Sequence, residues 1–208
     1  MTTNQPTDTV QQGVDLERFH EFIEHATANP DEVQMELGAR APYEGRLFHS
    51  LASVDEFTLG GEDIKRDTRE YTLPLGAWKE VEEAAGFIDP TDRMEPIEVA
   101  LAALAGCLNV AVGVTALANE IELDDLETTV RVDFDPRVIL MIHDLDHAEE
   151  SFDDIRVEIE VAGENLTDDD ADILAAGAKR SPVWGLMRFA HDMEPVVDVG
   201  RRAEPARR

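Results

Sequence analysis

The residue of this chain best suited to covalent chemistry is its single cysteine, Cys107. A thiolate is a strong nucleophile, so an accessible cysteine is a candidate catalytic group. Cys107 lies eleven residues into a predicted helix that begins at Pro96. The positions three and four residues away are all apolar: Ala103, Leu104, Val110 and Ala111. Helical periodicity by itself therefore favours a small core residue, and a reactive thiol is the alternative.

Two other places offer polar side chains that chemistry might use. Ser181 directly precedes Pro182 and lacks a Gly-x-Ser-x-Gly surround, which favours a helix cap over a serine nucleophile. The run His143-Asp-Leu-Asp-His147 offers imidazoles and carboxylates, but it lies in an acid-rich loop without a third spaced histidine. We interpret this loop as solvated, and we expect neither a metal site nor a cofactor.

Three large apolar side chains, Trp184, Met187 and Phe189, follow Ser181 closely. At this spacing they are typical of core or subunit contacts. The alternative is that they line a pocket for an apolar substrate near Cys107.

In the first half of the chain, the sequence predicts a helix, several short strands and a second short helix around these residues. Residues 1–13 are polar and predict a flexible tail, and residues 14–28 place apolar side chains at helical spacing until Asn29-Pro30 ends the helix. Alternation over 32–40 predicts a half-buried strand, and Gly60-Gly61 predicts a turn. Further short strands are predicted over 45–50, 56–59 and 69–75, with a short helix between 75 and 86.

The second half has clearer patterns. A long apolar helix is predicted from Pro96 to about Glu120, and strands are predicted over 126–134 and 155–161. A helix over 167–179 capped by Thr167, a short helix from Pro182 and a closing strand over 195–199 follow. Paired strands around one central helix indicate an α+β class, with one domain over 14–200 and an Arg-rich tail over 201–208.

The charge balance excludes two classes of partner. The chain of 208 residues has 46 acidic and 18 basic residues, a net charge of −28, and only three of the basic residues are lysines. Nucleic acids and anionic membranes would repel such a surface, so we expect neither as a partner. Abundant carboxylates with little lysine resemble the salt-adapted proteins of halophiles, and an ordinary acidic cytosolic protein is the alternative.

The remaining composition bears on location. One cysteine excludes an internal disulfide. The N-terminal residues have no apolar signal core, so we expect a cytoplasmic protein. The apolar run over 99–118 approaches the length of a membrane span but contains Asn109 and many small residues, which favours a buried core helix.

The residues from Glu95 to Cys107 resemble the central-helix motif of the OsmC/Ohr family, in which a proline and an acidic position precede an Ala/Leu-rich helix that reaches a cysteine. Farther along, Ser181-Pro-Val resembles the family's Cys-Pro-Val before a short helix. The resemblance covers roughly residues 95–199.

This resemblance implies an OsmC-like α+β fold, with antiparallel sheets around a long buried central helix and two intertwined subunits in a homodimer. It implies that Cys107 attacks the O–O bond of an organic hydroperoxide as a thiolate, with an arginine and a glutamate activating it. A second cysteine resolves the sulfenic acid in such family members.

The sequence departs from this pattern at two positions. The resolving position is Ser181, which cannot form a disulfide, and Ile97 follows the proline, so Glu98 is the nearest acidic residue. Arg40 and Arg46 are the candidates for the activating arginine. We therefore predict a site of Cys107, Glu98 and Ser181 that reduces organic hydroperoxides, or reacts with other sulfur-reactive compounds, with an external thiol as reductant. The alternative is a non-catalytic protein of the same fold that binds a small molecule.

Overall fold

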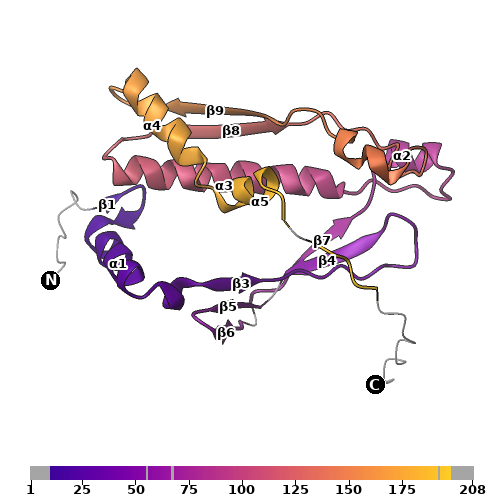
Figure 1. Ribbon diagram of the computed structural model, residues 1–208, viewed down its shortest axis with the longest axis horizontal. Coiled ribbons are helices and arrows are strands. Elements are labelled where there is room, and N and C mark those ends of the chain that lie inside the picture. The colour runs from indigo at the N-terminus through magenta and orange to yellow at the C-terminus, as the bar shows by residue number, and fades with distance from the viewer. Residues whose placement is uncertain (1–9, 55, 67, 192, 198–208) are drawn as a thin grey trace.

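The computed structural model describes residues 10–54, 56–66, 68–191 and 193–197. One long helix, α3 (Pro96–Ala118), runs through the middle of the molecule (Figure 1). A two-stranded sheet lies along one side of this helix, and a second helix, α4 (Asp168–Ala178), packs against α3. The strands of the N-terminal half lie on the other side of α3. The predicted α+β class with antiparallel sheets and a long central helix is confirmed.

Helix α3 begins where the sequence predicts, because its first turn satisfies its own free N–H groups. Glu95 is the N-cap and accepts the N–H of Ile97, the Glu98 carboxylate accepts the N–H of Glu95, and Pro96 needs no partner at the first position. By length and composition, α3 is the one described helix apolar enough to cross a membrane. It packs instead against β8, α4 and α5 as a core helix.

The C-terminal elements form a packed layer on α3. The strands pair in antiparallel register with Asp125 opposite Ala162, and α4 is capped by Thr167, whose hydroxyl accepts the N–H of Asp170. Gly177 allows α4 to approach α3 closely, because a Cβ there would lie 2.1 Å from the Thr115 hydroxyl. The bounds are β8 (Asp125–Arg131), η3 (Leu145–Glu150), β9 (Arg156–Ala162), α4 (Asp168–Ala178) and α5 (Pro182–Arg188).

The hydrophobic core cluster of the described residues lies in this layer. Its buried members come from one face of α3, from the turn after it and from α4: Leu104, Leu108, Val112, Ala116, Ile121, Leu174 and Ala178. Side chains from one face of β8 and β9, together with Val183 and Trp184 of α5, pack around them.

We call the N-terminal elements from β3 to β7 the N-terminal arm. It holds two small antiparallel sheets with strand orders β3-β5-β6 and β4-β7, and it follows a hairpin and a helix. The preceding elements are β1 (Val10–Gln11), β2 (Val14–Asp15), α1 (Leu16–Ala28) and η2 (Pro30–Val33). The strands of the arm are β3 (Met35–Leu37), β4 (Ser50–Val54), β5 (Phe57–Leu59), β6 (Glu62–Ile64) and β7 (Tyr71–Leu75), followed by α2 (Lys79–Ala84).

Several sequence predictions for the N-terminal half need correction. The strand predicted over 45–50 is wrong up to residue 49, because Gly45 and Phe48 take positive φ values of 84° and 67° in a turn and β4 begins only at Ser50. The strand predicted over 32–40 is shortened to β3 by the 3-10 turn at Pro30, and all three of its residues are exposed in the chain rather than half-buried.

The predictions for the two ends of the chain also differ from the structure. The flexible tail predicted over 1–13 is wrong from Val10 onward, since β1 pairs with β2 and the Gln11 side chain donates to the Ile121 carbonyl. Residues 195–197 have no regular structure, so the closing strand is wrong over that part. Residues 1–9, 198–199 and the Arg-rich tail over 201–208 lie outside the described residues.

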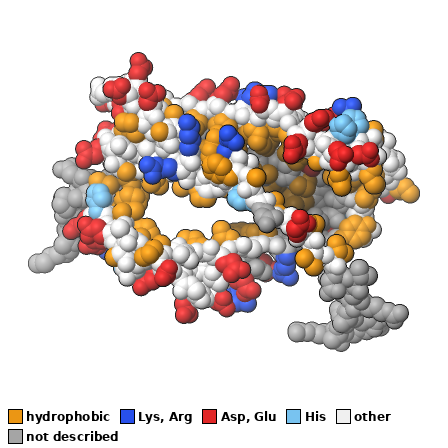
Figure 2. Space-filling view, in the orientation of Figure 1, with side chains coloured by type: hydrophobic (Ala, Val, Ile, Leu, Met, Phe, Trp, Pro, Cys, Tyr) orange, Lys and Arg blue, Asp and Glu red, His pale blue; other side chains and the backbone are white. Residues whose placement is uncertain are grey.

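The single chain exposes an unusually large surface to solvent. Its accessible area is 16976 Å², whereas a compact monomer of this mass would expose roughly 10,000 Å². The space-filling view shows an opening between the N-terminal arm and the C-terminal layer, with hydrophobic side chains along its rim (Figure 2). Acidic side chains are spread over both layers in the same view.

Candidate active site on the central helix

Cys107 lies at the boundary between the covered and the uncovered face of α3. Leu104 and Leu108 point into the core and are 1% exposed, while Gly106 and Val110 are exposed. Cys107 itself is partly exposed and carries a free thiol. The helix register therefore makes the sulfur reachable from the face that the chain's own core does not cover.

Glu98 has a local role at the start of α3. Its carboxylate accepts the backbone N–H of Glu95 at 2.9 Å and so completes the capping box. Cys107 is nine residues farther on, which corresponds to about 14 Å along the helix axis. The capping bond holds this carboxylate at the first turn.

Ser181 serves as the N-cap of α5, as the sequence favoured. Its hydroxyl accepts the backbone N–H of Trp184 at 3.2 Å, and the residue is 2% exposed. Because α5 packs against α3, Ser181 lies in the layer that contains Cys107. A buried hydroxyl that caps a helix is held in place by that bond, and nothing around it resembles a nucleophile elbow.

In the described part of the chain, the Cys107 thiol makes no polar contact that would activate it. Among residues 10–54, 56–66, 68–191 and 193–197, no hydrogen bond or ion pair reaches the Cys107 sulfur. The guanidinium of Arg46 donates to Glu82 and to the Asp89 carbonyl, and the backbone of Arg40 pairs with Ser53. Within one subunit, we therefore assign neither Arg40 nor Arg46 as the arginine that activates the Cys107 thiol.

The other candidate side chains are placed apart from Cys107 or as packing. The rings of His143 and His147 lie 5.0 Å apart, and His147 pairs with Glu150. Within the described ranges, no three His, Cys, Asp or Glu side chains are grouped for a metal ion. Trp184 packs against the core, which confirms the core interpretation for that residue, whereas Phe189 is exposed.

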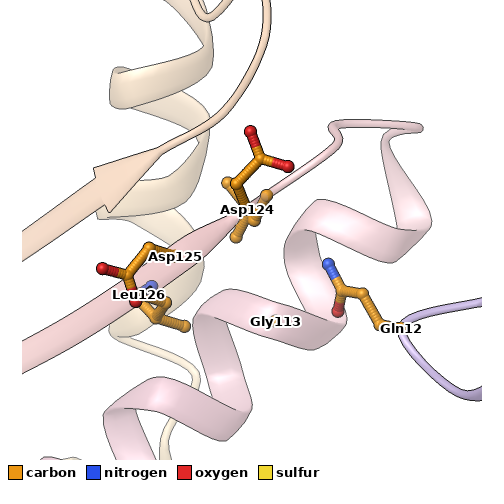
Figure 3. Close-up of a pocket in the computed structure, with 6 residues that line it drawn as sticks. Gln12, Gly113, Asp124, Asp125 and Leu126 are labelled. Atoms are coloured by element: carbon orange, nitrogen blue, oxygen red, sulfur yellow. Dashed lines mark hydrogen bonds between the residues drawn. The ribbon is translucent and has the colours of Figure 1, made fainter.

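A small surface pocket of about 200 Å³ opens between α3 and the start of β8 (Figure 3). Gly113, Asp124 and Asp125 line it together with Gln12, which comes from the N-terminal hairpin. Gly113 is six residues from Cys107, about 9 Å along the helix axis. The pocket is therefore separate from the thiol.

The family model for OsmC-like proteins matches residues 89–194, a segment that contains Cys107, Glu98 and Ser181. The chain belongs to the OsmC-like family. The match begins just before α3 and spans the whole C-terminal layer, so the part of this OsmC-like protein that carries the core is the part that defines the family.

Solved structures similar to this OsmC-like protein come from several bacteria. They include an OsmC-like protein of Mycoplasma pneumoniae (15% identity, 74% of this chain and 87% of that chain, TM-score 0.48) and an organic hydroperoxide resistance protein OsmC of Legionella pneumophila (19%, 74% and 89%, 0.46). OhrB of Bacillus subtilis, an organic hydroperoxide resistance protein, matches at 15% identity over 74% and 90% of the two chains, with a TM-score of 0.44. The comparison with curated proteins gives no match.

Proposed function

We propose that this OsmC-like protein reduces organic hydroperoxides with Cys107 as its single reactive thiol. The observation that carries the proposal is the position of Cys107, which is partly exposed on the uncovered edge of α3, inside the segment that defines the family. The exposed Ala103 and Gly106 beside it leave space for a small molecule to approach the sulfur.

The proposed cycle balances with one hydroperoxide and two external thiols. The Cys107 thiolate attacks the O–O bond, one oxygen becomes part of a sulfenic acid, and the other leaves with a proton as the alcohol. An external thiol condenses with the sulfenic acid to a mixed disulfide and releases water. A second external thiol then displaces Cys107 as thiolate, and the two external thiols leave as their disulfide.

An external thiol is required because the resolving position holds Ser181, which cannot form a disulfide. Ser181 has no sulfur and its hydroxyl is occupied as the cap of α5. We assign Glu98 the role of fixing the first turn of α3, and we assign the activating cation to the partner subunit, since Arg46 is engaged by Glu82 in its own chain.

The proposed unit is a homodimer in a cytoplasm of high salt. The exposed face of α3 is apolar at Val110 and Val114, and the chain's 16976 Å² of surface is several thousand Å² more than a compact monomer would have. An obligate interface between two copies buries about 2,000–5,000 Å² in total, so association would cover part of this excess. High salt would screen the repulsion between two copies that each have a net charge of −28.

A second function is favoured by one specific observation. Because no charged group of the described chain contacts the sulfur, the same face suits a non-catalytic protein that binds a small apolar or sulfur-containing molecule beside an unreactive thiol. The reactivity of the thiol distinguishes the two functions.

The test measures the alkylation rate of Cys107 against pH, the trapping of sulfenic acid after organic hydroperoxide, and the consumption of hydroperoxide with a small thiol, all in molar KCl. We expect alkylation of Cys107, trapped sulfenic acid, and loss of consumption in Cys107→Ser. Ser181→Ala is the matched control and should retain consumption, because its hydroxyl takes no part in the cycle.

Two outcomes would contradict the proposal. A thiol that resists alkylation and gives no trapped sulfenic acid would favour the binding protein. Consumption that persists in Cys107→Ser would place the chemistry at another residue.

A further inference from the structure

A buried carboxylate with several donors lies at the junction of the N-terminal arm and the segment that leads into α3. Glu82, on α2, has no exposed surface. Its carboxylate accepts the backbone N–H of Thr91 at 2.8 Å and the Arg46 guanidinium at 3.1 Å, and it lies 2.5 Å from Nε2 of His49. We call Arg46, His49, Glu82 and Thr91 the junction cluster.

Aromatic rings cover the junction cluster. Phe87 stacks on Phe48 with a centroid distance of 5.4 Å, and the Arg46 guanidinium lies 5.1 Å from the Phe87 centroid. His49 is 4% exposed beneath the same ring. A carboxylate in such surroundings is costly to leave without donors, so the cations are needed for its burial.

The geometry excludes a nucleophilic triad. The Thr91 hydroxyl and the Glu82 carboxylate both contact Nε2 of His49, at 3.5 Å and 2.5 Å. A relay needs the acid on one ring nitrogen and the hydroxyl on the other. The cluster is therefore a structural contact.

The charged groups on every side of Glu82 favour its ionised form. Arg46 and His49 come from the loop before β4, and Thr91 comes from the segment after α2, where the Asp89 carbonyl accepts a second bond from Arg46. Nearby ion pairs join Lys79 to Glu83 on α2 and Arg93 to Glu44 across the same junction.

Burial alone would raise the pKa of the Glu82 carboxyl. The hydrogen bonds from Thr91 and His49, with the charges of His49 and Arg46, outweigh burial and lower the pKa below its ordinary value of 4.5. A carboxyl whose pKa is lower in the folded state stabilises that state above pH 4.5, and this contribution is lost as the pH falls through the folded value.

We infer that the junction cluster is an acid-sensitive latch that holds the N-terminal arm to the segment preceding α3. The latch joins the loop at 46–49 to α2 and to residues 87–91 that follow α2, and His49 and Glu82 are 33 residues apart in the sequence. The arm contributes no member to the hydrophobic core cluster, so its position depends on this contact together with the backbone hydrogen bonds that join Gly76 to Met94 and Arg93 to Ala77. Protonation of Glu82 removes the charge that holds Arg46 and His49, and the arm separates while the C-terminal layer stays folded.

The two tryptophans of the chain allow the two regions to be followed separately. Trp78 is the N-cap of α2, and its carbonyl accepts the N–H of Glu82, whereas Trp184 packs against the core. In Trp184→Phe the fluorescence reports on the latch, and in Trp78→Phe it reports on the core. Each variant is titrated from pH 7 to pH 3 in molar KCl and back.

We expect the Trp78 emission to change at a higher pH than the Trp184 emission, and reversibly. Glu82→Gln in the Trp184→Phe background should show the acid-state Trp78 emission already at pH 7. Glu83→Gln is the matched control on the exposed side of α2 and should titrate as the unsubstituted chain does. If Trp78 and Trp184 change together, or if Glu82→Gln behaves as Glu83→Gln does, the latch is refuted.

A second variant keeps the test decisive if Glu82→Gln fails to fold, which the Trp184 emission of Glu82→Gln in the Trp78→Phe background would reveal. His49→Gln retains an amide donor but loses the charge that helps to lower the pKa of Glu82. We expect its Trp78 transition at a higher pH than in the unsubstituted chain. An unchanged transition in His49→Gln would refute the latch independently.

Discussion

The C-terminal layer and the N-terminal arm bury different kinds of side chain. The layer places apolar residues from α3 and α4 against one another, with Leu104 and Leu108 almost fully covered. The arm leaves Met35 and Leu37 exposed, and Glu82 and His49 are the largest side chains buried at its junction. The layer is thus held mainly by hydrophobic burial within one chain, and the arm is held by an ionic contact and, in our proposal, by a second copy.

The largest difference between the regions should appear on truncating leucines. Leu108→Ala removes a core side chain and should lower the free energy of unfolding by about 2–5 kcal/mol. Leu37→Ala makes the same chemical change at a 71% exposed position of the arm and should cost less than about 0.5 kcal/mol. Chemical denaturation in molar KCl measures both, and equal losses would contradict the assignment of the core.

A charge on the uncovered face of α3 should break association without unfolding the layer. Val110 is 64% exposed in the single chain, and Val110→Glu would place a charge where our proposal puts the partner subunit. Light scattering should give a dimer for the unsubstituted chain and a monomer for Val110→Glu, with the Trp184 emission retained. Gln34→Glu, which adds the same charge at an exposed position outside α3, should remain dimeric, and a dimer in both variants would contradict the proposed face.

The smallest effect is expected from salt, and it should act on both regions. Because the net charge is −28, raising KCl from low to molar concentration should raise the melting temperature by several degrees through screening. Melting curves followed separately at Trp78 and Trp184 would show whether the arm gains more than the layer. An unchanged melting temperature across the series would favour an ordinary acidic protein over a halophilic one.

Much of the C-terminal layer could be predicted because its signals are local. Proline at the first position with Glu95 before it fixes the start of α3, Thr167 fixes the start of α4, and Ser181 caps α5 as expected. Cys107 could be found because it is the only thiol of the chain.

The junction cluster could not be predicted in the same way. His49 and Glu82 are 33 residues apart and belong to no sequence motif, so only folding brings them together. In a chain with 46 acidic residues, nothing in the sequence distinguishes Glu82 from its exposed neighbours on α2.

The sequence by itself determined the class of fold, the central helix and the single thiol of this OsmC-like protein, because helix periodicity, caps and residue counts are properties of neighbouring residues. Only the tertiary structure decided which face of α3 is covered and that Arg46 pairs with Glu82. These outcomes depend on contacts between distant segments, whose energies no local pattern encodes.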